Sequence, residues 1–158
     1  MQITKCVNPN DEQKKDIYRL WNNEYPAQLG YQRFSDLELY LANLKNPVHY
    51  FLVDDDGNAI GWAFVFERDG ERWFAIIVDG SMHKKGLGSL LLNMLKENEQ
   101  ILNGWATDHN KYVTQDGRLY PSPVAFYLKN GFSTCDEIRL EIEKLSAVKI
   151  RWARTTTD

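Results

Sequence analysis

A short glycine-containing turn between two apolar segments carries the strongest chemical signal in this chain of 158 residues. The turn runs from His83 to Ser89 with the sequence HKKGLGS, and it follows the apolar run from Trp73 to Val78. The run predicts a buried strand, and the leucines after the turn recur with the spacing of one helix face. Glycines let backbone N–H groups approach a ligand, and the first N–H groups of a helix have no partner within it. This stretch therefore predicts an anion site, to which Lys84 and Lys85 add positive charge.

Two other glycine motifs that bind phosphates do not match this turn. A P-loop requires GxxxxGK[ST], and no lysine follows Gly88. A dinucleotide-binding fingerprint requires a third glycine, and Leu91 stands at its position. The two glycines by themselves are equally compatible with a tight turn that binds nothing. A second motif is needed to decide.

The segment Pro123–Phe132, with the sequence PVAFYLKNGF, supplies this second motif. The turn and this segment, in this order, resemble the two acyl-CoA motifs of the GNAT superfamily of N-acetyltransferases. The turn is similar to the pyrophosphate loop of that family, and FYLKNGF is similar to the short helix of its second cofactor motif. The resemblance covers roughly Gln2 to Trp152, with the N-terminal third matching by the pattern of elements only.

Two positions depart from the family pattern. His83 stands where the family usually has Gln or Arg, but the phosphate contacts of this loop come mostly from backbone N–H groups, so we still expect binding. Tyr120 stands where the family often has Asn, seven residues before the tyrosine of the second motif. No contact is therefore carried over to Tyr120.

The resemblance implies an α/β fold of the α+β type. Its GNAT-like sheet would be mixed and mostly antiparallel, with about six to seven strands, about four flanking helices, and a split between the fourth and fifth strands. The residue pattern predicts the element order β-α-α-β-β-β-α-β-α-β-β, and the length predicts one domain over residues 1–158. The expected strands are 2–7, 49–53, 59–67, 73–78, 105–107, 132–135 and 147–152.

Local signals predict where the helices begin and end. Asn10 with Gln13, and Ser35 with Glu38, have the spacing of capping boxes at the first two helices. Asn46-Pro47 is expected to end the second helix, Asn103-Gly104 to break the chain before the fifth strand, and Ser122 to cap a helix that starts at Pro123. Residues 108–120 are expected to form a polar loop.

The resemblance also implies acetyl-CoA as the acyl donor. The backbone of the fourth strand would bind its pantetheine arm, and the turn would bind its pyrophosphate; the residues concerned are Ile76, Ile77, Val78, His83, Lys84, Lys85, Gly86, Leu87, Gly88 and Ser89. A Cβ at Gly88 would intrude on the phosphate. Free N–H groups near Ile77 and Val78 could stabilise the developing oxyanion. Tyr127 matches the general acid of the family, although a tyrosine on a short amphipathic helix can also be a core residue.

The general base is not evident from the motifs. The family often has a Glu on the fourth strand, but Arg72 occupies that position here, with Glu71 beside it, so the role is not carried over. Asp108 and His109 follow the fifth strand, and His109 has a side chain that titrates near neutral pH. A solvated loop is an equally good interpretation of these two residues, and a water relay could replace a base.

Substrate contacts are predicted by position alone. Glu24 and Tyr25 stand at the end of the first helix, where the family usually gathers them. The net charge of −3 mildly favours a cationic acceptor such as a polyamine, an aminoglycoside or a lysine side chain.

The composition argues against several other functional classes. The net charge of −3 and the pI near 5.6 argue against a nucleic-acid binder. No apolar run reaches the length of a membrane span, and no export signal is evident, so we expect a cytoplasmic protein with two reduced cysteines, Cys6 and Cys135. The three histidines are scattered, so no metal is expected.

Three functional hypotheses follow. The leading one is an N-acetyltransferase, an acyltransferase that moves an acetyl group from acetyl-CoA to a primary amine of a small molecule or peptide. The second is a non-catalytic acyl-CoA-binding or sensor domain on the same fold. The third is an interaction module that uses the five tryptophans. A homodimer is possible because dimers are common in the family.

Overall fold

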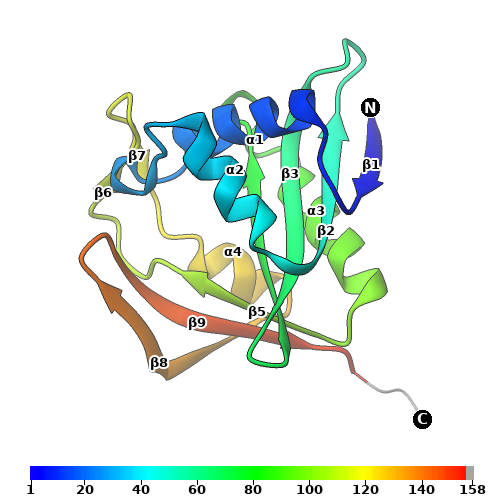
Figure 1. Ribbon diagram of the computed structural model, residues 1–158. Coiled ribbons are helices and arrows are strands. Elements are labelled where there is room, and N and C mark those ends of the chain that lie inside the picture. Colours follow the sequence, from blue (N-terminus) through cyan, green and yellow to red (C-terminus); the bar gives the residue numbers. More distant parts are fainter. Residues whose placement is uncertain (156–158) are drawn as a thin grey trace.

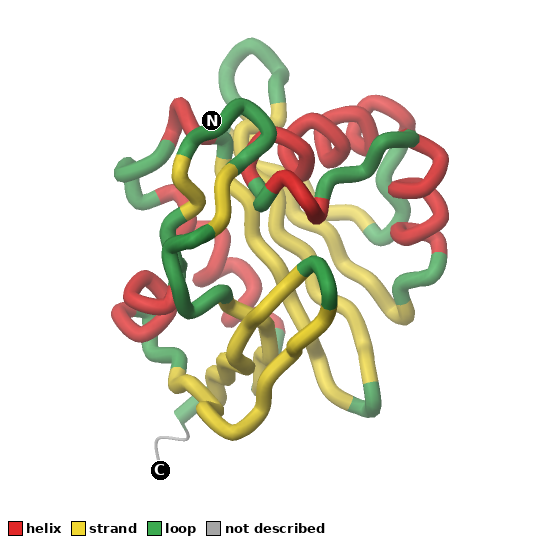
Figure 2. Tube along the Cα trace, turned by 90° about the vertical axis from the view of Figure 1, so that its left-hand side faces the viewer, coloured by secondary structure: helices red, strands yellow, loops and turns green. Residues whose placement is uncertain are grey.

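One seven-stranded sheet lies between two layers of helices in the computed structural model, which describes residues 1–155 (Figure 1). Helices α1 and α2 cover one face of the sheet, and α3 and α4 cover the other (Figure 2). The helices are α1 (Asp11–Glu24), α2 (Phe34–Ala42), α3 (Leu87–Asn98) and α4 (Val124–Lys129), with short 3-10 helices η1 (Ala27–Leu29) and η2 (Gly80–Met82). The strands are β1 (Gln2–Cys6), β2 (Lys45–Val53), β3 (Ala59–Arg68), β4 (Glu71–Val78), β5 (Ile101–Ala106), β6 (Tyr112–Val113), β7 (Leu119–Tyr120), β8 (Ser133–Ile142) and β9 (Leu145–Ala153).

The strand order in the large sheet is β1-β2-β3-β4-β5-β9-β8. Among the described residues, β4 and β5 form its one parallel pair, because α3 crosses between them, and the other neighbours are antiparallel. The predicted mixed, mostly antiparallel sheet and its element order are therefore confirmed. Strands β6 and β7 form a separate hairpin within the segment that we expected to be a loop.

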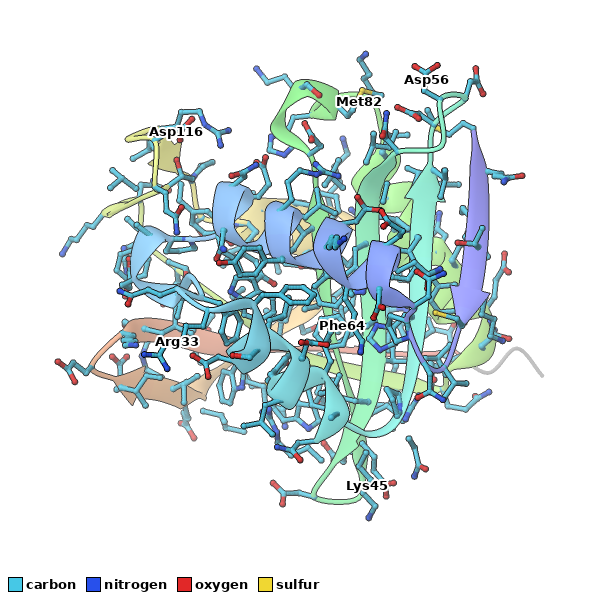
Figure 3. The ribbon with its side chains drawn as sticks, turned by 45° about the horizontal axis from the view of Figure 1, so that its top comes forward. Arg33, Lys45, Asp56, Phe64, Met82 and Asp116 are labelled. Atoms are coloured by element: carbon cyan, nitrogen blue, oxygen red, sulfur yellow. The ribbon has the colours of Figure 1, made fainter. Side chains whose placement is uncertain are left out.

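Strand β3 forms the centre of both hydrophobic layers, because its side chains alternate between two buried faces. Trp62 and Phe64 pack against α1 and α2, and Ala63 and Val65 pack on the side of α3. Figure 3 shows Phe64 among the rings beneath the first two helices. A Cβ at Gly61 would lie 2.9 Å from Leu91 of α3, so this glycine lets α3 lie directly on the sheet.

Strands β4 and β5 pair at a single position, Trp73 with Asn103, and then diverge. On one face the rings of Trp73 and Trp105 meet with their centroids 5.2 Å apart. On the other face Phe74 occupies the space beside Gly104, where a Cβ would lie 2.8 Å from its ring. These rings occupy the space between β4 and β5 and keep the two strands apart. The expected split between the fourth and fifth strands is therefore confirmed. Within residues 1–155, the β5-side edge of β4 has no strand partner beyond Trp73.

One of the two predicted capping boxes is confirmed. The side chain of Asn10 accepts the N–H of Gln13 at 2.8 Å, and the Gln13 side chain accepts the N–H of Asn10 at 2.8 Å. The second box, Ser35 with Glu38, is wrong. Helix α2 begins one residue before Ser35 without a side-chain cap, and Glu38 instead pairs with Lys14 at 3.4 Å.

Two predicted chain breaks lie inside strands. Pro47 lies in β2, where a register shift between Lys45 and Val48 accommodates a residue that cannot donate a ladder hydrogen bond. Gly104 lies in β5, where the Phe74 ring requires a residue without a Cβ. The last two strands are longer than expected. Helix α4 begins at Val124, one residue later than expected, so Pro123 and not Ser122 is at the N-cap position. The Ser122 hydroxyl still accepts the N–H of Val124 at 3.3 Å.

Candidate active site

A cavity of about 720 Å³ lies between the free edge of β4, the turn before α3, and α4. All the residues that we predicted to bind the cofactor line this cavity, except Lys85. Tyr127, Glu24 and Tyr25 line it too. The structure thus brings the two sequence motifs together at one cavity.

The turn before α3 forms a cradle of free N–H groups. Gly86 precedes the helix with a φ of 76°, in the left-handed region that favours glycine. Leu90 is the first residue of the helix to donate, to Gly86 O at 3.1 Å. Within the described residues, the N–H groups of 84–89 have no hydrogen-bond acceptor. This geometry suits an anion such as a pyrophosphate, and Lys84 and Lys129 add positive charge to the walls.

Gly88 has a packing role that sequence reasoning missed. A Cβ at this position would lie 3.1 Å from the Phe126 ring. The turn and α4 therefore approach each other closely at Gly88, whatever occupies the cradle.

Glu24 connects three segments around the mouth of the cavity. It accepts the N–H of Gly80 at 2.9 Å and lies 3.6 Å from the guanidinium of Arg118 and 4.0 Å from Nε2 of His83. His83 Nε2 in turn donates to the Val78 carbonyl at 2.8 Å. Because the Glu24 carboxylate already contacts these protein groups, its geometry suits the positioning of the turn before α3 better than contact with an acceptor. Arg118, from the unpredicted hairpin, was missed because its contact with Glu24 is long-range.

The segments that Glu24 connects lie at one end of the molecule, where Figure 3 shows Met82 of η2 and Asp116 of the β6–β7 hairpin. A more polar cavity of about 480 Å³ opens between them, lined by Glu24, Asp79, Asp116 and Arg118 among others. Three acidic side chains and one arginine therefore line this cavity.

A further cavity, of about 300 Å³, lies on the α1–α2 side of the split between β4 and β5. It shares five lining residues with the cavity of about 720 Å³, which we call the cofactor-side cavity: Tyr25, Ile76, Tyr120, Pro123 and Tyr127. The two cavities therefore meet at three tyrosine side chains. Tyr120 was not predicted as a site residue, since only its departure from the family pattern was visible in the sequence.

Tyr127 is 8% exposed, and its ring packs against Phe74 and Phe132 with centroid distances of 5.7 and 5.3 Å. Its side chain lines both cavities. Burial raises the pKa of Tyr127, and the neighbouring Tyr120 raises it further; burial also raises the pKa of Tyr120 to about 12 and that of Tyr25 well above its usual value. All three hydroxyls therefore keep their protons at neutral pH and can donate hydrogen bonds.

The structure does not bring Asp108 and His109 to either cavity. Asp108 forms a two-point ion pair with Arg139 at 2.7 and 3.1 Å, and this contact lowers the pKa of its carboxyl group. Nδ1 of His109 accepts the N–H of Lys111 at 3.1 Å, and its ring lies against Tyr112. Their predicted catalytic role stays a prediction without geometric support.

The described residues contain no group of three or more His, Cys, Asp or Glu side chains that could hold a metal ion. None of the helices in this part of the chain is both long and apolar enough to cross a membrane. Cytoplasmic location and dimer formation stay predictions.

Residues 46–134 match the family model described as the acetyltransferase (GNAT) domain. No curated protein matches this chain. Several solved structures share its fold. An aminoglycoside 6'-N-acetyltransferase complexed with coenzyme A is 17% identical, with a TM-score of 0.74 and 100% of each chain covered.

Two further structures show the same fold at similarly low identity. A spermidine N-acetyltransferase variant from Vibrio cholerae is 18% identical, with a TM-score of 0.65, 97% of this chain covered and 95% of that one. A GNAT-family acetyltransferase from Staphylococcus aureus Mu50 is 13% identical, with a TM-score of 0.66 and coverages of 96% and 99%. The family model spans more than half of the residues, and the chain therefore belongs to the GNAT family of acetyltransferases.

Proposed function

We propose that this enzyme transfers an acetyl group from acetyl-CoA to a neutral primary amine of a small molecule. The observation that carries the proposal is the meeting of two cavities at the split between β4 and β5, one with an anion cradle and one with an aromatic lining. A donor on one side and an acceptor on the other would face each other at the tyrosines.

The donor side fits an acyl-CoA. Its cavity of about 720 Å³ contains free N–H groups and two lysines for phosphate charge. The structural neighbour crystallised with coenzyme A supports the same choice of donor. The bound donor would supply a thioester, which activates the acetyl group for attack.

The backbone of β4 offers hydrogen bonds to this donor. Asp79 N–H donates to Ile60 O at 2.8 Å, and bonded pairs alternate along an antiparallel ladder. The N–H of Ile77 therefore faces β3, whereas those of Ile76 and Val78 face the side that β5 leaves. We assign the pantetheine contacts and the oxyanion donor to these two residues.

Transfer forms a bond between the amine nitrogen and the acetyl carbon and breaks the bond between that carbon and sulfur. The amine loses one proton and the departing thiolate gains one. We assign to Tyr127, which lines both cavities, a hydrogen bond to the departing sulfur. Its raised pKa keeps the hydroxyl protonated as the donor, and the thiolate would take its proton from water. The Tyr127 ring packs edge-on against Phe74.

The described lining of the acceptor-side cavity contains no carboxylate or imidazole that could act as a base. Apolar surroundings lower the pKa of an ammonium group, because burial disfavours the charged form. The acceptor would thus reach the reaction centre as a neutral amine, and the one proton that its nitrogen loses on forming the amide would pass to water. The volume of about 300 Å³ favours a small molecule over a peptide.

The test combines calorimetric titration of acetyl-CoA with a thiol-release assay over classes of amine. Binding followed by turnover with at least one class supports the proposal. Binding without turnover over the panel would favour the acyl-CoA sensor function. Absence of binding would contradict the assignment of the cradle.

A further inference from the structure

The acceptor-side cavity has an unusual lining for a site that handles amines. Among its described residues, Arg68 is the only one with a charged side chain. The aromatic residues around it are Trp21, Tyr25, Tyr40, Phe64, Phe66, Trp73, Phe74, Trp105, Tyr120 and Tyr127. An apolar, flat body suits such walls, because aromatic rings pack well against one another.

Arg68 is an exposed residue at the end of β3, and its guanidinium lies over the rings of two paired neighbours. The centroids of Phe66 and Trp73 are each 5.2 Å from the guanidinium carbon. Within the described residues, Arg68 forms no ion pair and no hydrogen bond. Its register partner Glu71 is directed instead to Lys149, at 3.9 Å. The planar set of N–H donors is thus held in place by the rings and free to bind a ligand, and it matches a carboxylate in two-point geometry.

The same arrangement opposes a polycationic acceptor. A polyamine or aminoglycoside would need carboxylates to pair its remaining ammonium groups, and the cavity offers a guanidinium instead. The carboxylates of Glu24, Asp79 and Asp116 line the separate polar cavity and not this one. The overall negative charge is therefore a poor guide to this acceptor.

The position of Arg68 sets the spacing of the ligand groups. Its guanidinium lies over Trp73, whereas the two cavities meet at Ile76, three residues further along β4. At about 3.3 Å per residue the two points are separated by about 10 Å. An anionic group at Arg68 and an amine at the meeting point must therefore lie at opposite ends of the ligand.

We propose that the acceptor is a small amine on an apolar or aromatic body that carries a carboxylate at its far end, and that Arg68 binds this carboxylate. The inference rests on the proposed function, since it names the acceptor class for the same site. Arg68 acts in specificity, and the transfer step itself is unchanged.

The experiment compares matched acceptors that differ only in the carboxylate: para-(aminomethyl)benzoate and benzylamine. Phenylalanine, with both groups on one carbon, tests the spacing, and spermidine tests the polycation class. Arg68→Gln removes the charge, and Arg68→Lys keeps the charge without the two-point geometry. Arg33→Gln is the matched control, because Arg33 is an exposed arginine that lines neither cavity.

We expect the wild type to acetylate para-(aminomethyl)benzoate with a higher kcat/KM than any of the other three amines. Arg68→Gln should lower kcat/KM for this acceptor by about 10- to 100-fold, mainly through KM, and leave benzylamine unchanged. Arg68→Lys should fall in between, and Arg33→Gln should behave as wild type. Acetyl-CoA affinity should be the same in all variants.

Two results would overturn the inference while leaving the proposed function intact. One is a wild type that prefers benzylamine or spermidine. The other is an Arg68→Gln variant that loses activity equally on para-(aminomethyl)benzoate and benzylamine. A wild type that binds no acetyl-CoA would instead overturn the proposed function, and calorimetry separates the two failures.

Discussion

Gly86 is the residue at which the anion cradle depends most directly on backbone conformation. Its φ of 76° lies in the left-handed region, and a Cβ added there would meet no atom within 4 Å. Gly86→Ala therefore adds no clash. It imposes only the conformational cost of a left-handed L-residue, about 1–2 kcal/mol.

This cost becomes a loss of affinity if bound acetyl-CoA needs the cradle while the free loop can relax. A cost of about 1–2 kcal/mol corresponds to a Kd for acetyl-CoA that is about 5- to 30-fold higher. Gly86→Asn is the matched control, because asparagine also carries a Cβ but tolerates the left-handed region. We expect Asn to recover most of the affinity that Ala loses.

Calorimetric titration of acetyl-CoA into the three proteins measures the effect, and urea unfolding checks that the fold is retained. Equal affinity in Gly86→Ala and wild type would refute the reasoning that acetyl-CoA binding draws on the left-handed conformation at Gly86. An equal loss in Ala and Asn would refute the conformational explanation and indicate a steric one.

Two further predictions concern stability. Burial lowers the pKa of His49 to about 4, so the unfolded chain binds a proton at this side chain more tightly than the folded protein does. The free energy of unfolding should therefore fall as the pH drops below about 6.5, by roughly 3 kcal/mol at pH 4 and below. The Trp62 N–H donates to His49 Nδ1 at 3.1 Å, and an asparagine side chain could accept it instead. His49→Asn should therefore flatten the pH dependence of stability in urea titrations. A steep pH dependence in this variant would show that another group causes it. Gly104→Ala should destabilise by about 1–3 kcal/mol, because its Cβ would lie 2.8 Å from the Phe74 ring; adding Phe74→Leu should recover part of this, and unchanged stability in the single variant would contradict the packing of this ring at the split.

The element order was predictable because most of the signals are local. The alternation in β3 and the leucine spacing in α3 depend on neighbouring residues only, and the capping box at Asn10 is complete within four residues. The position of the cofactor-side cavity was predictable for the same reason, since each of its two motifs is continuous in sequence.

The errors involve residues whose environment is set by distant parts of the chain. Gly104 was interpreted as a break, and only the ring of Phe74 from another strand explains a glycine inside β5. Glu38 was interpreted as a cap, but Lys14 of α1 is its partner. Arg68 was not singled out in the sequence, since its place on the acceptor cavity emerges only when β3 and β4 bring Phe66 and Trp73 together.

The central claim is that the two cavities meet at a hydroxyl that assists the leaving thiolate. Tyr127→Phe tests it most directly, because the ring can keep its packing against Phe74 and Phe132 while the hydroxyl is lost. With an accepted amine, kcat should fall by about 100- to 10,000-fold, while the Kd for acetyl-CoA and the unfolding midpoint stay near those of the wild type. Wild-type turnover in Tyr127→Phe would contradict the account and leave Tyr127 as a core residue beside the site.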